Sequence, residues 1–324
     1  MIIDSFLAFN EIELANFRIN YLWDFTEKVI IGESNLTHSG MKKPMYFTEW
    51  LATRPDLKEK VHIVEIKLDH LNGNWEREIA SREFVQKYLR ENFGSYRAIL
   101  SDLDEIPTKE QVVEFLELEE NVHFPMRTYY RKANFALTDA HHKFWNYGVM
   151  IYDHVNLPSN GGRYASLPSI QSSEAGGHFS YLGMNRDLVS LKLESFAHSE
   201  LGRAHLKSSY FIEFCNRFGI DHLGRFQERG MGIFKVVNSD AFSRLQSEMY
   251  KFQPLWFHSS ETQSPTILRG LASAVVSHAT KNVIGSVAAQ NAIAQNQGTL
   301  NWIFKAKLGI FLQVGRKFLR TLGV

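Results

Sequence analysis

Four short apolar runs alternate with helical patterns over the first hundred residues, and this alternation limits the possible folds more than any other feature. The runs cover residues 2–9, 29–31, 61–66 and 97–100. Apolar residues after the first run recur at roughly helical spacing, and a long amphipathic helix is predicted over about 75–93. Strands that alternate with helices predict an α/β fold with a mainly parallel central sheet.

Polar residues follow three of these runs. Asn10 and Glu11 follow the first run, Glu33 follows the second, and Asp102 and Asp104 follow the fourth. Asn10 is also suited to cap the next helix. In open α/β sheets, ligands bind beyond the carboxyl ends of the strands. The sequence therefore predicts a binding site where these residues meet.

The segment SDLDEIP places two carboxylates on one side of an extended chain, because residues i and i+2 point the same way. Asp102 and Asp104 can then share one hard divalent cation such as Mg²⁺ or Mn²⁺. A solvated acidic turn, or the start of a helix at 107–110, is the alternative interpretation. Haloacid-dehalogenase-like phosphatases also have Asp-x-Asp after a strand, but there it normally follows the first strand.

Composition excludes several classes of protein. The chain has 324 residues, is 44% hydrophobic, and has one cysteine, so it has neither an internal disulfide nor a cysteine-built zinc site. A net charge of +1 gives no overall attraction to nucleic acid. The N-terminus does not resemble a signal peptide, and no long apolar stretch follows it. A cytoplasmic location is therefore expected.

The charge is unevenly distributed, which predicts an appended segment. Residues 262–324 carry seven basic side chains and no acidic one, so they have a charge of +7 and residues 1–261 have −6. We therefore expect one domain over 1–262 and a helical, basic extension over 263–324. Residues 299–324 have the pattern of a helix that lies on an anionic membrane, and packing on the protein's own core or in a homo-oligomer interface is the alternative.

Five ordered blocks resemble glycosyltransferase family 17, and together they span roughly residues 1–230. The family includes the bisecting β-1,4-N-acetylglucosaminyltransferase of animal N-glycans and many bacterial relatives, and this chain resembles a bacterial-type member. The blocks are FNEIELANFRINYLWDFTEKVIIGESNLTHSG, KKPMYF, SDLDEIP, GGHFSYLG and KLESFAHSE. One departure is clear: Gly176-Gly177-His178 stands where the family usually has Gly-Trp-His.

The resemblance implies a GT-A-like fold and an inverting transfer of sugar from a nucleotide-sugar donor to a glycan hydroxyl. The sugar would typically be N-acetylglucosamine from UDP-GlcNAc, with Mn²⁺ or Mg²⁺, in surface polysaccharide or lipopolysaccharide synthesis. No partnership with nucleic acid is expected. A lipid-linked acceptor would suit a peripheral place on the inner face of the membrane. A non-catalytic glycan- or nucleotide-sugar-binding protein on the same fold is the alternative.

Site residues follow from the same resemblance. Asp102 and Asp104 match the family's Asp-x-Asp, and His198 is the expected third metal ligand, with His178 as its alternative. Glu174 is the first candidate for the catalytic base, with Glu200 and Asp187 as rivals. The predicted donor-binding residues are Asn10, Glu11, Glu33, Thr37, His38, Arg77, Arg82 and Asp102, and the predicted acceptor-binding residues are His178, Phe179 and Tyr181. Helix capping, exposed helix faces and core packing would explain many of these residues equally well.

Overall fold

A computed structural model describes the chain over residues 1–137, 144–145, 148–152, 166–170, 174–197, 208, 211–212, 215, 221 and 234–258. All of these residues belong to one unit, Met1–Val276. The predicted extension over 263–324, His198 and Glu200 lie outside the described residues.

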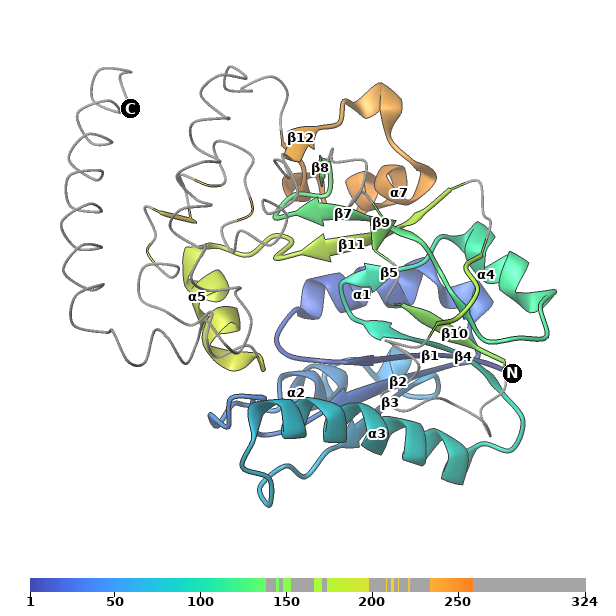
Figure 1. Ribbon diagram of the computed structural model, residues 1–324, viewed down its shortest axis with the longest axis vertical. Helices are drawn as coiled ribbons and strands as arrows, with labels where there is room; N and C mark the ends of the chain where they lie inside the picture. Colours follow the sequence, from blue (N-terminus) through green and yellow to red (C-terminus); the bar gives the residue numbers. More distant parts are fainter. Residues whose placement is uncertain are drawn as a thin grey trace. The chain divides into compact units, whose positions relative to one another are not determined.

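The first sheet contains the predicted parallel strands. Its order is β3-β2-β1-β4-β10-β6, and the four strands β1 to β4 are parallel. Figure 1 shows them in blue and cyan beneath the second sheet. The two remaining strands, β10 and β6, continue the sheet in antiparallel pairing. The strands are β1 (Ile2–Leu7), β2 (Lys28–Glu33), β3 (Val61–Glu65), β4 (Arg97–Asp102), β6 (Val122–His123) and β10 (Val149–Ile151). The predicted α/β class is confirmed.

Helices cover both faces of this sheet because side chains alternate along each strand. Ile3 of β1 packs in the core beneath α3 (Asn74–Asn92), together with Leu89 of that helix. Phe6 points to the other face and shares a core with Phe17 of α1 (Ile12–Tyr21). The short helix α2 (Tyr46–Ala52) contributes Phe47 to the same core as α1.

Helix α1 begins two residues after Asn10, so the predicted cap is corrected by one position. Glu11 is the N-cap residue, and no side chain makes a capping hydrogen bond there. Asn10 contributes its backbone instead, since its carbonyl accepts from the N–H of Ile12. Asn is a common N-cap residue, so its position after a strand suggested a cap. The chain needs one more residue before it enters the helix.

A second sheet with the order β12-β8-β7-β11-β5 was not expected, because residues 120–200 are rich in aromatic residues, His and Gly, a composition more typical of loops than of strands. It begins directly after Asp104 and is mixed, with β7 and β11 parallel. Strand β9 pairs with β7. The strands are β5 (Glu105–Ile106), β7 (Met126–Tyr130), β8 (Phe135–Leu137), β9 (Phe144–Trp145), β11 (Gly176–Ser180) and β12 (Phe234–Val236).

Within the described residues, three further α-helices follow β5 along the chain. They are α4 (Lys109–Leu116), α5 (Arg186–Ser195) and α7 (Arg244–Phe252). Thr108 caps α4 by accepting from the N–H of Gln111. Short 3₁₀ turns cover Trp23–Phe25, Pro55–Leu57, Ser239–Ala241 and Pro254–Trp256. Within the described part of the chain, no helix has the length and apolar character needed to cross a membrane.

Candidate active site

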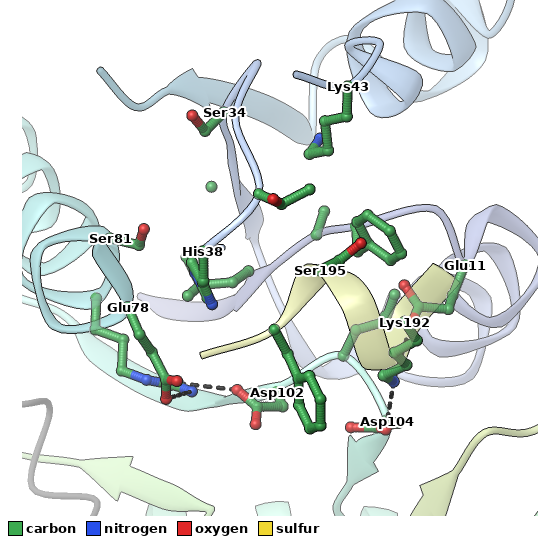
Figure 2. Close-up of a pocket in the computed structure, with 18 of the residues that line it drawn as sticks. Glu11, Ser34, His38, Lys43, Glu78, Ser81, Asp102, Asp104, Lys192 and Ser195 are labelled. Atoms are coloured by element: carbon green, nitrogen blue, oxygen red, sulfur yellow. Dashed lines mark hydrogen bonds and ion pairs between the residues drawn. The ribbon is translucent and has the colours of Figure 1, made fainter. Parts of the chain in front are cut away.

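A pocket of about 470 Å³ lies at the carboxyl ends of the parallel strands, where the sequence predicts a site. It is called the strand-end pocket here, and its size is that of a small-molecule site. Figure 2 shows its polar side chains converging from several elements. Residues after β1, β2, β3 and β4 line it, with α3 and α5 on its sides and β11 beside the Asp-x-Asp.

The Asp-x-Asp loop is fixed by its own backbone and by Glu105. The Glu105 carboxylate is fully buried and accepts from the N–H of Asp102 at 2.8 Å. The carbonyl of Asp104 accepts from the N–H of Phe179 on β11 at 2.8 Å. The loop is thus held at both ends, and both aspartate side chains line the strand-end pocket.

A buried arginine, Arg18, holds this loop through hydrogen bonds to its backbone. Arg18 of α1 binds both oxygens of Asp4, with Nε–Oδ2 at 2.9 Å and Nη2–Oδ1 at 2.6 Å. Its Nη1 also donates to the carbonyls of Asp102 at 2.7 Å and Glu105 at 3.0 Å. Both Arg18 and Asp4 have no exposed surface, so the core and the Asp-x-Asp loop share one buried ion pair.

Lys192 of α5 joins two acids on one side of the strand-end pocket. Its Nζ lies 3.0 Å from Glu11 Oε1 and 3.3 Å from Asp104 Oδ2. Burial opposes ionisation of Glu11, but the charge and hydrogen bond of Lys192 outweigh it and lower the pKa of Glu11. Burial likewise opposes the charge of Lys192, but Asp104 and Glu11 raise its pKa. Glu11 and Lys192 are therefore both charged at neutral pH.

Arg82 of α3 occupies the opposite side. Its Nη1 lies 2.9 Å from Asp102 Oδ1, and its Nη2 lies 3.2 Å from Glu78 Oε1. Glu78 precedes Arg82 by one helical turn, so the two side chains share a helix face. The carboxylates of Asp102 and Asp104 thus each contact a cation from a different helix.

His38 and Thr37 line the strand-end pocket from the loop after β2. Burial lowers the pKa of His38 to about 4, and Arg82 and Arg77 act in the same direction. Arg77 itself does not line the pocket; it supports this loop by donating to the carbonyls of His38 at 3.1 Å and Leu71 at 2.9 Å. His38 is therefore neutral at pH 7.

Glu33 lies at the end of β2 but caps a helix instead of lining the strand-end pocket. Its buried carboxylate accepts from the N–H groups of Phe47 at 2.8 Å and Thr48 at 2.9 Å, in the first turn of α2. Lys43 lies 3.7 Å from Glu33 and does line the pocket. Burial lowers the pKa of Lys43, although Glu33 opposes this effect.

The predicted acceptor-binding residues divide into two groups. His178 and Tyr181 line the strand-end pocket, and His178 Nε2 lies 3.1 Å from Ser180 Oγ and 4.0 Å from Asp104 Oδ2. Phe179 points to the other face of β11 and stacks on Tyr129, with ring centroids 4.9 Å apart. Its ring also fills the space beside Gly177, where an added Cβ would lie 2.2 Å from the Phe179 ring. A large side chain at 177 therefore requires Phe179 to move.

Glu174, the first candidate for the base, is held away from the Asp-x-Asp. Its Oε2 accepts from the N–H of Arg244, at 3.2 Å, in the first turn of α7. It precedes His178 by four residues of extended chain, about 13 Å at 3.3 Å per residue. Neither Glu174 nor Asn10 lines the strand-end pocket. Asp187 is exposed in the first turn of α5, and the rival Glu200 lies outside the described residues.

The chemistry of Asp102 and Asp104 fits a divalent cation that brings ligands of its own. Their oxygens are of the type that Mg²⁺ and Mn²⁺ prefer, and both side chains line the strand-end pocket. Across the described ranges, no group of three or more His, Cys, Asp or Glu side chains could hold a metal alone. Phosphate oxygens, water or His198, which lies outside those ranges, would have to complete the coordination.

The charged side chains of the strand-end pocket that sequence reasoning missed are Lys43, Glu78 and Lys192, and it also missed Trp75. Lys192 begins the block KLESFAHSE, and Lys43 lies in KKPMYF, so both were on quoted segments without an assigned role. A useful signal was available for Glu78, which precedes the predicted donor residue Arg82 by one helical turn. Trp75 is 44% exposed although it lines the pocket, which places an aromatic surface within reach of a ligand.

The sequence profile of glycosyltransferase family 17 matches residues 1–214. The search of curated proteins found no match. Among solved structures, the chain is similar to the crystal structure of HddC from Yersinia pseudotuberculosis, with 13% sequence identity and a TM-score of 0.31 over 55% of this chain and 88% of that one.

Proposed function

The chain belongs to glycosyltransferase family 17, and from this membership we propose that it is a GT-A-like, metal-dependent, inverting enzyme that uses UDP-GlcNAc. Family membership itself implies a transferase with a nucleotide-sugar donor and a glycan acceptor. The proposed product is a surface polysaccharide or lipopolysaccharide of a bacterial cell. The observation that carries the proposal is the meeting of Asp102 and Asp104 with three basic side chains in one pocket.

In this proposal, the strand-end pocket receives the donor. Arg82, Lys192 and Lys43 supply positive charge for the diphosphate, and Arg82 has a guanidinium that matches phosphate geometry. Asp102 and Asp104 would hold Mn²⁺ or Mg²⁺, which would stabilise charge on the leaving diphosphate. Glu11 keeps Lys192 oriented toward the pocket through their hydrogen bond.

The acceptor would approach along β11 and α5. His178 and Tyr181 line the pocket there, next to Asp104. Inverting transfer needs a base that takes the proton of the acceptor hydroxyl. Glu200 is the proposed base, because it follows Phe196, a residue of the pocket lining, by only four positions. Glu174 is engaged at α7 and is the weaker candidate.

A screen of donors with the intact protein tests this function. UDP-, GDP- and CMP-sugars are added with Mn²⁺, and thermal unfolding is followed. A ligand at 100 times its dissociation constant stabilises a protein by about 2.7 kcal/mol, so the cognate donor should be recognised readily. Slow Mn²⁺-dependent hydrolysis of UDP-GlcNAc that EDTA abolishes supports the enzyme. Binding without turnover favours a binding protein, and release of inorganic phosphate favours a phosphoesterase.

A further inference from the structure

The ammonium group of Lys192 contacts two carboxylates that line the strand-end pocket. Lys192 Nζ bridges Glu11 Oε1 at 3.0 Å and Asp104 Oδ2 at 3.3 Å, and it lies 5.5 Å from the ring centroid of Tyr181. Figure 2 shows this contact at the lower right of the strand-end pocket, with Lys192 descending from α5. Lys192 belongs to α5, Glu11 is the N-cap residue of α1, and Asp104 lies in the loop after β4.

The bridge places a fixed positive charge on the carboxylate that would coordinate a divalent cation. A metal ion bound at Asp104 would lie within a few ångströms of Lys192, where like charges repel strongly in a partly buried site. Only 14% of the Asp104 side chain and 23% of the Lys192 side chain are exposed, so solvent screens this repulsion weakly. Asp102, by contrast, pairs with Arg82 and is 32% exposed.

We propose that Lys192 keeps Asp104 from binding a free divalent cation, and that Asp104 coordinates the cation only when a nucleotide diphosphate binds as well. The diphosphate supplies negative charge for both Lys192 and the incoming metal. Glu11 retains one hydrogen bond to Lys192 throughout, which limits how far the side chain moves. Metal and nucleotide therefore bind together, and metal alone binds weakly. This inference rests on the proposed function for the identity of the ligand.

The test measures binding of Mn²⁺ alone to the full chain, by electron paramagnetic resonance of the free ion, without nucleotide. Lys192→Gln should bind Mn²⁺ at least about 10-fold more tightly than the wild type, which corresponds to 1.4 kcal/mol. Lys192→Arg keeps the charge and should bind as weakly as the wild type. Asp104→Asn introduced into Lys192→Gln should remove the gain, because the gain depends on that carboxylate.

Two controls keep the result specific. Lys43→Gln removes another basic side chain of the strand-end pocket, but one that lies 3.7 Å from Glu33 and not beside Asp104. It should change Mn²⁺ affinity much less than Lys192→Gln does. Thermal unfolding confirms that each variant is folded, and Lys192→Met replaces Lys192→Gln if the glutamine variant does not fold.

An unchanged Mn²⁺ affinity in folded Lys192→Gln or Lys192→Met overturns the inference. So does a wild type that binds UDP and yet binds Mn²⁺ alone as tightly as it does with UDP. Both outcomes are distinguishable from failure of the proposed function, in which no nucleotide sugar stabilises the wild type. A gain in Mn²⁺ affinity without any nucleotide binding would keep the inference about Lys192 and reject the proposed donor.

Discussion

Arg18 and Asp4 form an ion pair inside the protein, with Arg18 Nη2 2.6 Å from Asp4 Oδ1 and no exposed surface on either side chain. The same guanidinium donates to the carbonyls of Asp102 and Glu105. Its charge is therefore shared between a strand of the core and the loop that carries the candidate metal ligands. This contact makes the stability of the fold and the geometry of the Asp-x-Asp depend on one residue.

Arg18→Met should strongly destabilise the protein, because it leaves Asp4 buried without its partner. Removing one partner of a buried pair costs about 3–5 kcal/mol. Urea unfolding at pH 7 measures the loss. The double variant Asp4→Asn, Arg18→Met should recover part of it, since no charge is then left buried. Arg54, whose partner Asp56 is more than half exposed, is the control, and Arg54→Met should change little. Equal losses for Arg18 and Arg54 would contradict the argument.

Asp104→Asn should abolish the Mn²⁺-dependent stabilisation by the nucleotide sugar and leave the fold intact. The amide keeps the shape of the side chain but loses the charge that holds the metal. Thermal unfolding with and without donor and Mn²⁺ measures both effects. Asp69→Asn makes the same chemical change at an exposed position outside the strand-end pocket and should behave as the wild type does. Normal donor binding and turnover by Asp104→Asn would remove this residue from the site.

His38 should make the protein less stable as the pH falls from 6.5 to 4. Burial lowers its pKa in the folded protein from 6.5 to about 4, so the unfolded chain takes up a proton first in this interval. The stabilisation is complete above pH 6.5 and is lost as the pH falls toward 4; its size is at most about 3 kcal/mol. Urea unfolding between pH 4 and 7 should show that the free energy of unfolding depends less on pH in His38→Gln than in the wild type. An equal pH dependence in both proteins would show that the folded and unfolded states protonate His38 alike.

The parallel half of the fold could be predicted because its sequence repeats one pattern. Apolar strands that alternate with helices can be recognised from the local sequence alone, and β1 to β4 fall on the predicted runs. The second sheet could not be predicted, since β5 and β9 have two residues each and β8 and β12 have three, too few to show alternation. Their pairing depends on distant partners such as β7 and β11.

The site was predicted best where a residue follows a parallel strand. Glu11, His38, Asp102 and Asp104 all line the strand-end pocket because the carboxyl ends of neighbouring strands meet at one edge. Residues chosen by type alone were less informative. Glu33 caps α2 and Phe179 packs in the core, and sequence spacing does not distinguish such uses from ligand binding.

Residues 299–324 carry five basic side chains and no acidic one, and their attachment to an anionic membrane stays a prediction. The full chain should co-sediment with vesicles that contain anionic lipid, because each basic residue near such a surface contributes about 1 kcal/mol. Removal of residues 299–324 should abolish this binding, and high salt should weaken it. A full chain that ignores the vesicles, with a truncated chain that aggregates, would instead indicate a structural role for these residues.

Glu200→Gln and Glu174→Gln form a matched pair that identifies the base. Both remove a carboxylate and keep its shape, so any difference between them reflects position. Glu200→Gln should retain donor binding and lose turnover at least about 100-fold, the lower end of general-base contributions. Glu174→Gln should retain most of its turnover, because the Glu174 carboxylate is engaged with the N–H of Arg244 at the start of α7. Its glutamine can still accept that hydrogen bond.

Initial rates of Mn²⁺-dependent UDP-GlcNAc hydrolysis, with donor affinity measured in parallel, separate the two roles. The opposite pattern, with Glu174→Gln inactive and Glu200→Gln active, would require the acceptor to bind near α7 and not beside Asp104.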